Sequence, residues 1–367
     1  MASAGGEASG PTRVLEYVRL FRGASIALVV IAHAKLAMTW PAPLDDPARL
    51  LRALIEGGDI PFFLVAGYLF RLSAERGFRY GPYLVGRWKN VIVPYLFCSI
   101  PALLHAFVFR YGVFENLSAR RPLDVAAELG LSLLTAQHMF VPFWFIPTIA
   151  LLYVAAPALL WIDRRPRLYA LVPVAVVVGS MLHLSPLYRD VVRDAADVLP
   201  VYVAGMALHR FQAEVFGALR RFPLRLPLAI VALTLGEVAF GEPGRFASQQ
   251  PFSTEGGVLD FGYLQKALLS LWVLERLEAW RPAAAGLGRA ASAALGRLAD
   301  LSFGVFFGHM YVQSFLLVPA LRALSLAPRA SWLGVATIGL TVLVSTTALI
   351  ALAKRVLGPR SRILIGC

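Results

Sequence analysis

The chain has 367 residues, of which 58% are hydrophobic and only 16% are charged. Soluble globular domains have about 45–50% apolar and about 25% charged residues, so the composition excludes an ordinary soluble protein. The formal net charge of +13 is spread between apolar segments and does not form a basic face, so it does not indicate nucleic-acid binding. The two cysteines, Cys98 and Cys367, are too few for a disulfide framework or a metal site.

Ten apolar segments are long enough to cross a bilayer alone, or with burial by their neighbours. They predict an all-α polytopic membrane protein with about ten transmembrane helices. The segments comprise residues 20–38, 57–71, 91–111, 139–161, 168–184, 197–210, 227–241, 262–276, 301–320 and 332–352.

Positive charge alternates between the connections of these segments. The connections on one side, both chain ends included, hold 23 of the 35 Lys and Arg residues. Cytoplasmic loops of membrane proteins retain an excess of these residues, so we expect both termini to be cytoplasmic. On this basis residues 1–12 are predicted to form a disordered cytoplasmic tail, residues 13–356 the transmembrane domain, and residues 357–367 a short cytoplasmic tail.

In the first apolar segment, the polar residues Arg22 and His33 are the informative ones, since a charge at membrane depth is costly unless it is paired or used. Eleven residues on an α-helix make three turns plus about 20° and a rise of about 16 Å, so both side chains share one face. Arg22 is expected near the cytoplasmic rim and His33 near the middle of the bilayer. This pattern is typical of a site that grips an anionic group at its mouth and reacts deeper inside. The alternatives are an arginine that snorkels to the interface and a histidine that only hydrogen-bonds a neighbouring helix.

The segment from Arg22 to His33 resembles the start of the acyltransferase-3 family of integral membrane O-acyltransferases. There an Arg or Lys, ten intervening residues and a His mark the first helix. Later segments resemble further motifs of that family in the same order: DIPFFLVAGY (59–68), RWKNVIVPY (87–95), PFWFIP (142–147) and SFGVFFGH (302–309). Two positions depart from the family pattern, because Arg19 stands where many members carry an acid and Ala66 replaces the usual serine.

The resemblance implies an O-acyltransferase of the bacterial inner (plasma) membrane. It would transfer an acyl group, most often acetyl, from acyl-CoA to a hydroxyl of a carbohydrate or another hydroxylated acceptor. Such a transfer needs a base for the hydroxyl proton, donors for the tetrahedral oxyanion and a grip on the anionic carrier. His33 is the candidate base, because imidazole titrates near neutral pH.

His309, in the ninth segment, lies at a depth that can bring it close to His33. It is the second candidate catalytic residue, either orienting the first imidazole or donating to the oxyanion. The alternative is a hydrogen bond between two helices.

Three basic residues, Arg22, Arg87 and Lys89, fall at the expected cytoplasmic edge, where the phosphates of an acyl-CoA donor would arrive. They are the candidate donor-binding residues. Basic residues beside a membrane also set topology and attract anionic lipid, which is the alternative for Arg87 and Lys89.

Three aromatic residues, Tyr95, Phe143 and Trp144, are candidates to line a substrate pocket, although aromatic belts at membrane interfaces also account for such residues. Glu237, in the outer half of the seventh segment, is a candidate to hydrogen-bond a sugar hydroxyl or lies near the outer headgroups. No metal is predicted, and the expected partners are the hydroxylated acceptor and membrane lipid.

A transporter or exporter of a glycan or related solute is the main alternative, since it would use the same helices and buried charges. A lipid-embedded sensor or scaffold would also be basic and apolar. A transporter does not consume acyl-CoA and gives no reason for Arg22 and His33 to share a face. The chain has no Gly-x-x-x-x-Gly-Lys-Ser/Thr loop, so ATP-driven pumping is not predicted.

Overall fold

The computed structural model of the chain describes residues 11–41, 43–109, 114–115, 120–136, 141–183, 190–240, 259–280 and 286–367. These ranges are helical and contain no strand; one isolated β-bridge joins Thr39 and Arg329. The prediction of an all-α protein is therefore confirmed for the described residues. The tail predicted at residues 1–12 lies outside them except for its last two residues, where the first helix begins.

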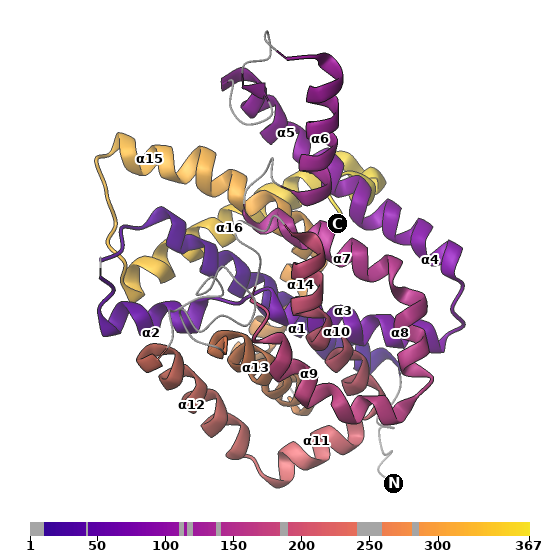
Figure 1. Cartoon of the computed structure of the whole chain (residues 1–367). Helices are drawn as coiled ribbons and strands as arrows, with labels where there is room; N and C mark the ends of the chain where they lie inside the picture. The colour runs from indigo at the N-terminus through magenta and orange to yellow at the C-terminus, as the bar shows by residue number, and fades with distance from the viewer. Residues whose placement is uncertain are drawn as a thin grey trace, which may run out of the picture.

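The helices form one bundle, in which segments far apart in the sequence lie side by side (Figure 1). Their bounds are α1 Pro11–Ala34, η1 Lys35–Ala37, α2 Asp46–Ile55, α3 Ile60–Glu75, α4 Tyr80–Arg87, η2 Trp88–Ile92, α5 Val93–Phe109, α6 Pro122–Thr135, η5 Val141–Trp144, α7 Phe145–Val154, α8 Ala156–Asp163, η6 Pro166–Leu171, α9 Val172–Gly179, α10 Val191–Arg210, α11 Gln212–Arg221, α12 Arg225–Phe240, α13 Phe261–Ala279, α14 Leu287–Tyr311, η8 Val312–Leu317, α15 Val318–Ala323, α16 Trp332–Leu357, η9 Gly358–Arg360 and α17 Ser361–Leu364.

Five stretches of described helix are long and apolar enough to cross a membrane. Two further pairs of helices qualify together but bend sharply between their members, by 59° between α7 and α8 and by 83° between α11 and α12. The described residues thus support five spans, or seven if each bent pair counts as one. The five stretches are Glu16–Ala37, Asp46–Glu75, Tyr80–Phe109, Leu287–Ala323 and Trp332–Leu364.

The predicted number of about ten spans is not confirmed, although the ten predicted segments fall largely on helices. Charge and length explain the difference. Helix α10 buries Asp194 and Asp197, and α13 buries Lys266 and Glu275, so both are more polar than a free-standing span. The apolar helix Pro166–Gly179 is too short to cross alone.

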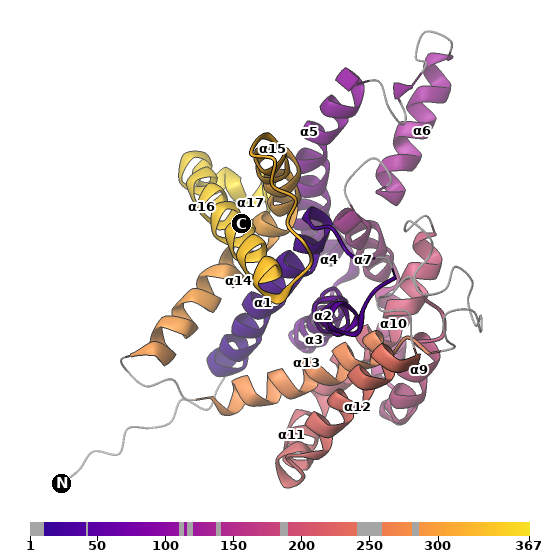
Figure 2. The ribbon, with the colours of Figure 1, turned by 90° about the vertical axis from the view of Figure 1, so that its left-hand side faces the viewer.

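Helix α1 lies inside the bundle and contacts α14, α16, α13 and α3 (Figure 2). Its approach to α14 depends on Gly23, where a Cβ would lie 2.1 Å from the carbonyl oxygen of Leu295. Only a residue without a Cβ permits that contact. The sequence of the first helix therefore fixes how closely its polar residues approach α14.

Helices α3 and α10 show the same kind of close approach. A Cβ at Gly67 would lie 1.8 Å from the carbonyl oxygen of Tyr202, and one at Gly205 would lie 1.9 Å from that of Leu64. Gly67 belongs to the motif in which Ala66 replaces the usual serine. The glycine of that motif thus has a packing role in this chain.

The outer faces of several helices are apolar and exposed, for example at Val108 on α5 (68% exposed) and Val344 on α16 (66% exposed). Apolar surface of this extent is typical of contact with lipid. Helices α5 and α6 also extend away from the other helices (Figures 1 and 2).

Candidate active site

A cavity of about 350 Å³ runs beside α1. Its wall includes Arg22 at the middle of that helix, His33 in its last turn and Lys35 just beyond it, so it follows the chain for about 16–20 Å. The remaining wall comes from residues 56–59, α3, α4, η2, η5, α7, α10, α14 and the segment after α16. Most of the lining is apolar with a few polar groups, as is typical of a small-molecule site.

His33 lies in the last turn of α1 and lines this cavity. Its Nδ1 donates to the carbonyl oxygen of Val29 at 2.8 Å. Because a carbonyl only accepts, the proton resides on Nδ1 and the lone pair of the neutral ring resides on Nε2. Within the described ranges Nε2 has no hydrogen-bond partner, so it is free to accept a proton from a ligand.

His309 lies on α14 opposite His33, with the two ring centroids 5.2 Å apart. It is fully buried and does not line the cavity. Its Nδ1 donates to the carbonyl oxygens of Val305 (3.1 Å) and Phe306 (2.8 Å), which leaves the lone pair on Nε2. A neutral ring in this tautomer accepts at Nε2 and cannot donate there.

The backbone of α1 at His33 is held by Gln313, whose Nε2 donates to the His33 carbonyl oxygen at 2.8 Å. Gln313 lies in η8, a π-helical segment directly after α14. A second π-helical segment, η2, separates α4 from α5 and contributes Asn90 and Val91 to the cavity wall. Such segments are rare and occur frequently at functional sites.

Arg22 lines the cavity at the end opposite His33. Its Nη2 donates to the carbonyl oxygen of Ala299 at 2.7 Å, and its Nε is buried without a partner among the described residues. Asp300, which also lines the cavity, is bound instead by Arg19 through two hydrogen bonds of 2.9 and 2.6 Å. Arg22 therefore presents a guanidinium with no carboxylate bonded to it.

Arg87 also lines the cavity, and its guanidinium lies 4.9 Å from the ring centroid of Tyr83 and 5.2 Å from that of Tyr153. The two rings hold the cation in place through cation–π contacts. Lys89 is exposed and does not line the cavity. The structure thus brings Arg22 and Arg87 to one cavity and leaves Lys89 on the surface.

The aromatic candidates separate in the same way. Trp144 lines the cavity, whereas Phe143 is buried in the core with its ring 5.2 Å from that of Phe307. Tyr95 donates its hydroxyl to the carbonyl oxygen of Leu133 at 2.6 Å and is buried away from the cavity. Glu237 is buried on α12 against α13, also outside the described cavity wall.

Beyond His33 the cavity ends at an ion pair that the sequence did not predict. Lys35 Nζ lies 2.6 Å from Glu56 Oε1, which also accepts from Arg52 Nε at 2.9 Å. Lys35, Glu56 and Asp59 all line the cavity. One sequence feature marks this end of the cavity. Residues 56–59 read Glu-Gly-Gly-Asp, directly before the motif that contains the Phe-Phe pair.

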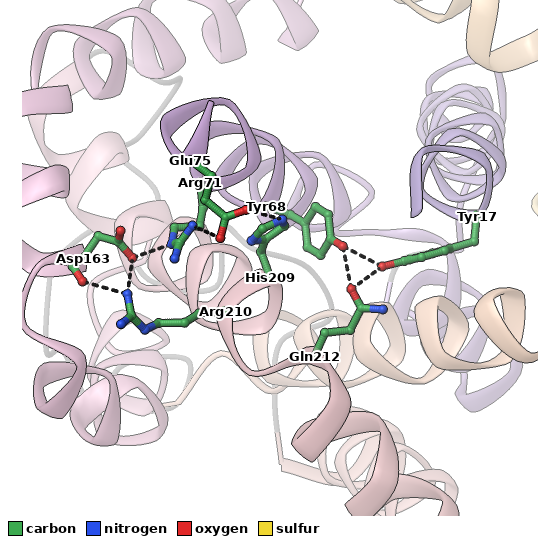
Figure 3. A network of polar contacts seen from close by, with 8 residues as sticks. All are labelled: Tyr17, Tyr68, Arg71, Glu75, Asp163, His209, Arg210 and Gln212. Atoms are coloured by element: carbon green, nitrogen blue, oxygen red, sulfur yellow. Dashed lines mark hydrogen bonds and ion pairs between the residues drawn. The ribbon is translucent and has the colours of Figure 1, made fainter. Parts of the chain in front are cut away.

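A second polar cluster lies outside the cavity wall and joins α1, α3, α8, α10 and α11 (Figure 3). We call it the interhelical network. It consists of Tyr17, Tyr68, Arg71, Glu75, Asp163, His209, Arg210 and Gln212.

Arg71 is the centre of the interhelical network. It forms an ion pair with Glu75 one turn along α3, and its Nε donates to Asp163 Oδ1 at 2.7 Å. Arg210 Nη1 lies 3.5 Å from the same Asp163 oxygen, and His209 Nε2 lies 3.8 Å from Glu75 Oε2. Each charged group in this network thus has at least one partner of opposite charge.

Three His, Cys, Asp or Glu side chains suited to hold a metal ion do not occur together in the described part of the chain. A family model described as an acyltransferase domain matches residues 15–353. The match includes α1 and α14, the helices that carry Arg22, His33 and His309. No curated protein and no solved structure matches the chain.

Proposed function

The chain belongs to the acyltransferase-3 family, and on this premise we propose that it transfers an acetyl group from acetyl-CoA to a hydroxyl of a carbohydrate or another hydroxylated acceptor. Membership of the family and the apolar helices make it a membrane acyltransferase. One observation supports the proposed transfer from acetyl-CoA to a hydroxyl. A single cavity is lined by Arg22, whose guanidinium bonds no carboxylate, and by His33, whose imidazole has a free lone pair.

The proposed orientation follows from the distribution of Lys and Arg along the sequence. It places both termini in the cytoplasm of a bacterium, the protein in the inner membrane, and the Arg22 end of the cavity at the cytoplasmic face. Coenzyme A thioesters are cytoplasmic, so the donor enters at that end. The ten apolar segments are proposed to cross the membrane, with the charged helices α10 and α13 shielded from lipid by their neighbours.

The donor is gripped at its phosphates. Arg22 and Arg87 line the same cavity, and a guanidinium binds phosphate oxygens through paired, charge-assisted hydrogen bonds. Arg87 already contacts two tyrosine rings, at 4.9 and 5.2 Å from their centroids, so little side-chain freedom is lost when it binds. Lys89 lies outside the cavity and is not part of this grip.

The acyl transfer itself is proposed to occur at His33. Nε2 accepts the proton of the acceptor hydroxyl while the hydroxyl oxygen forms a bond to the thioester carbonyl carbon. The tetrahedral intermediate then breaks its carbon–sulfur bond, and the proton passes from Nε2 to the leaving thiolate. The products are the O-acylated acceptor and the free thiol of coenzyme A.

His309 is proposed to position His33 rather than to stabilise the oxyanion. Its Nδ1 proton is engaged by two backbone carbonyls, so its Nε2 carries no proton to donate. Its ring instead lies 5.2 Å from that of His33 and restricts where the catalytic imidazole can turn.

The acceptor is proposed to bind at the opposite end, next to Lys35, Glu56 and Asp59. Carboxylates accept hydrogen bonds from vicinal hydroxyls, and an ammonium donates to them, so this end suits a sugar better than an apolar alcohol. His33 lies between this end and Arg22 along α1, where a hydroxyl and a thioester carbon can meet.

The experiment is a thiol-release assay on the purified full-length protein, with acetyl-CoA as donor and a panel of simple sugars as acceptors. We expect thiol release above background, acetyl-sugar in equal amount, and loss of both in His33→Ala. His105→Ala is the matched control, because His105 lies on α5 outside the cavity wall. No thiol release, together with uptake of the same sugars into vesicles, would contradict the enzyme and favour the transporter.

The orientation has its own test. In a background without Cys98 and Cys367, a cysteine introduced at the exposed Asp46 is expected to react with an impermeant maleimide in intact cells. A cysteine at the exposed Arg221 is expected to react only after the membrane is broken. The reverse pattern would place the Arg22 end on the outside and remove the donor's route to it.

A further inference from the structure

Residues 358–367 follow the matched family domain, which ends at residue 353. The sequence predicts a cytoplasmic tail here. In the structure they form η9 and α17, and α17 packs against α5, η2 and α16. Figure 2 shows α17 beside α16. This segment therefore returns to the bundle, and two of its residues, Arg362 and Gly366, line the cavity beside α1.

The return of the chain is fixed by specific contacts. Ser361 Oγ donates to the carbonyl oxygen of Cys367 at 2.5 Å, and the Cys98 thiol lies 3.7 Å from the Leu364 carbonyl oxygen. Gly366 has a φ of +76°, and a Cβ there would lie 2.5 Å from the ring of Phe303. The segment is thus wedged between α5 and α14 at the wall of the cavity, and its backbone turn requires glycine.

Arg362 has few protein partners of its own. Its Nε donates to Asn90 Oδ1 at 3.2 Å, and Asn90 in turn donates to the Gly86 carbonyl oxygen at 2.7 Å. Across the described ranges Arg362 makes no ion pair, and its two terminal nitrogens have no hydrogen-bond partner. Asn90 thus orients the Arg362 guanidinium through a neutral amide oxygen and leaves its positive charge uncompensated.

The positive charges on the cavity wall are not all paired within the protein. Three guanidiniums line the cavity, those of Arg22, Arg87 and Arg362. The acid on the same wall, Asp300, is bound through both oxygens by Arg19, which lies outside the wall. Arg22 and Arg362 thus have no carboxylate bonded to them among the described residues, and an anionic ligand would neutralise them.

We propose that Arg362, delivered by the segment that follows the family domain, is a third residue that binds the phosphates of the coenzyme A donor. This inference rests on the proposed function. The segment acts as a strap across the Arg22 end of the cavity, and Asn90 on the π-helical turn η2 positions its guanidinium. His33, the proposed site of the reaction, lies about 16 Å from Arg22 along α1, so a residue at the Arg22 end is expected to affect donor binding and not the chemical step.

The experiment measures binding of coenzyme A and of pantetheine, which has no phosphate, to the purified full-length protein in detergent, alongside the thiol-release assay. Arg362→Ala is expected to weaken coenzyme A binding about tenfold, the loss expected for one charge-assisted contact in a partly exposed site. Pantetheine binding and kcat are expected to stay unchanged. Arg362→Lys is expected to fall between the parent and the alanine variant, because the charge remains but the fork is lost.

The matched control is Arg360→Ala, an exposed arginine two residues earlier that does not line the cavity. It is expected to bind coenzyme A like the parent. Equal coenzyme A affinity in the parent and in Arg362→Ala, with thiol release intact, would overturn the role of Arg362 and leave the proposed function standing. A parent protein that binds no coenzyme A would overturn both.

Discussion

The cavity beside α1 and the interhelical network both contain Arg and His side chains on helices of the bundle. The two regions differ in whether these side chains are paired with carboxylates. In the network, Arg71 is bound by two carboxylates (Figure 3). In the cavity, Arg22 is bound by one backbone carbonyl, and the imidazole of His33 hydrogen-bonds only the carbonyl of its own helix.

The charges of the network hold helices together, whereas those of the cavity are available to a ligand. A buried charge is costly unless it is paired, and the network pairs its charges within the protein. The cavity leaves three arginines, Arg22, Arg87 and Arg362, without a carboxylate among their described partners. Substitutions in the network should therefore alter stability, and those in the cavity should alter activity.

The largest effect is expected from His33→Gln compared with His209→Gln. Glutamine keeps a hydrogen-bonding side chain but cannot take a proton at neutral pH, so the first variant should lose about 10²- to 10⁴-fold in kcat. His209→Gln should keep the parent's kcat, because His209 lies in the network. Initial rates of thiol release at saturating acetyl-CoA measure both. Similar kcat values in the two variants would contradict the proposal that the cavity acts in catalysis and the interhelical network in stability.

The second effect is on stability. Arg71→Met should lower the free energy of unfolding by about 2–3 kcal/mol. This is less than for a fully buried pair, since Arg210 still faces Asp163 and Glu75 is partly exposed. Equilibrium unfolding in detergent measures the loss, and the folded fraction should retain its kcat. A variant as stable as the parent would mean that the network does not hold the helices.

The third effect concerns the donor. Arg22→Lys should raise the KM for acetyl-CoA about tenfold and leave kcat unchanged, because lysine keeps the charge but cannot form the two-pronged contact with phosphate. Lys89→Ala is the matched control, since Lys89 is basic but lies outside the cavity wall. If Lys89→Ala changes KM more than Arg22→Lys does, the donor binds elsewhere.

The smallest effect is expected from Tyr17→Phe. The hydroxyl of Tyr17 lies 2.7 Å from that of Tyr68 and donates to Gln212 at 2.8 Å. Its removal should cost about 1 kcal/mol of stability, because the Tyr68–Gln212 hydrogen bond of 2.6 Å remains. Activity should not change, and a fall in kcat without a loss of stability would connect the network to catalysis.

Periodicity predicted much of what lies on α1. The spacing of Arg22 and His33 places both on one face, and the structure puts both on one cavity wall. The order of the motifs also indicated the family that the match over residues 15–353 shows. These features are local, because they depend on helix geometry within one segment or on short motifs.

Partners far apart in the sequence were not predictable from periodicity. Arg19 binds Asp300, 281 residues later, and Arg362 binds Asn90, 272 residues earlier. A helical pattern says which face a residue occupies but not which helix packs against that face.

Residue type within an apolar segment did not indicate which side chains face the cavity. Phe143, Tyr95 and Glu237 are in apolar segments but lie outside the described cavity wall. The ten predicted spans are not confirmed, because α10 and α13 carry charges that neighbouring helices would have to shelter.

The most direct test of the central claim is a cryo-EM structure of the full chain bound to a non-hydrolysable thioether analogue of acetyl-CoA. We expect the phosphates at Arg22, Arg87 and Arg362, with the acetyl carbonyl carbon next to Nε2 of His33. An analogue bound in the reverse direction, or outside the cavity beside α1, would contradict it.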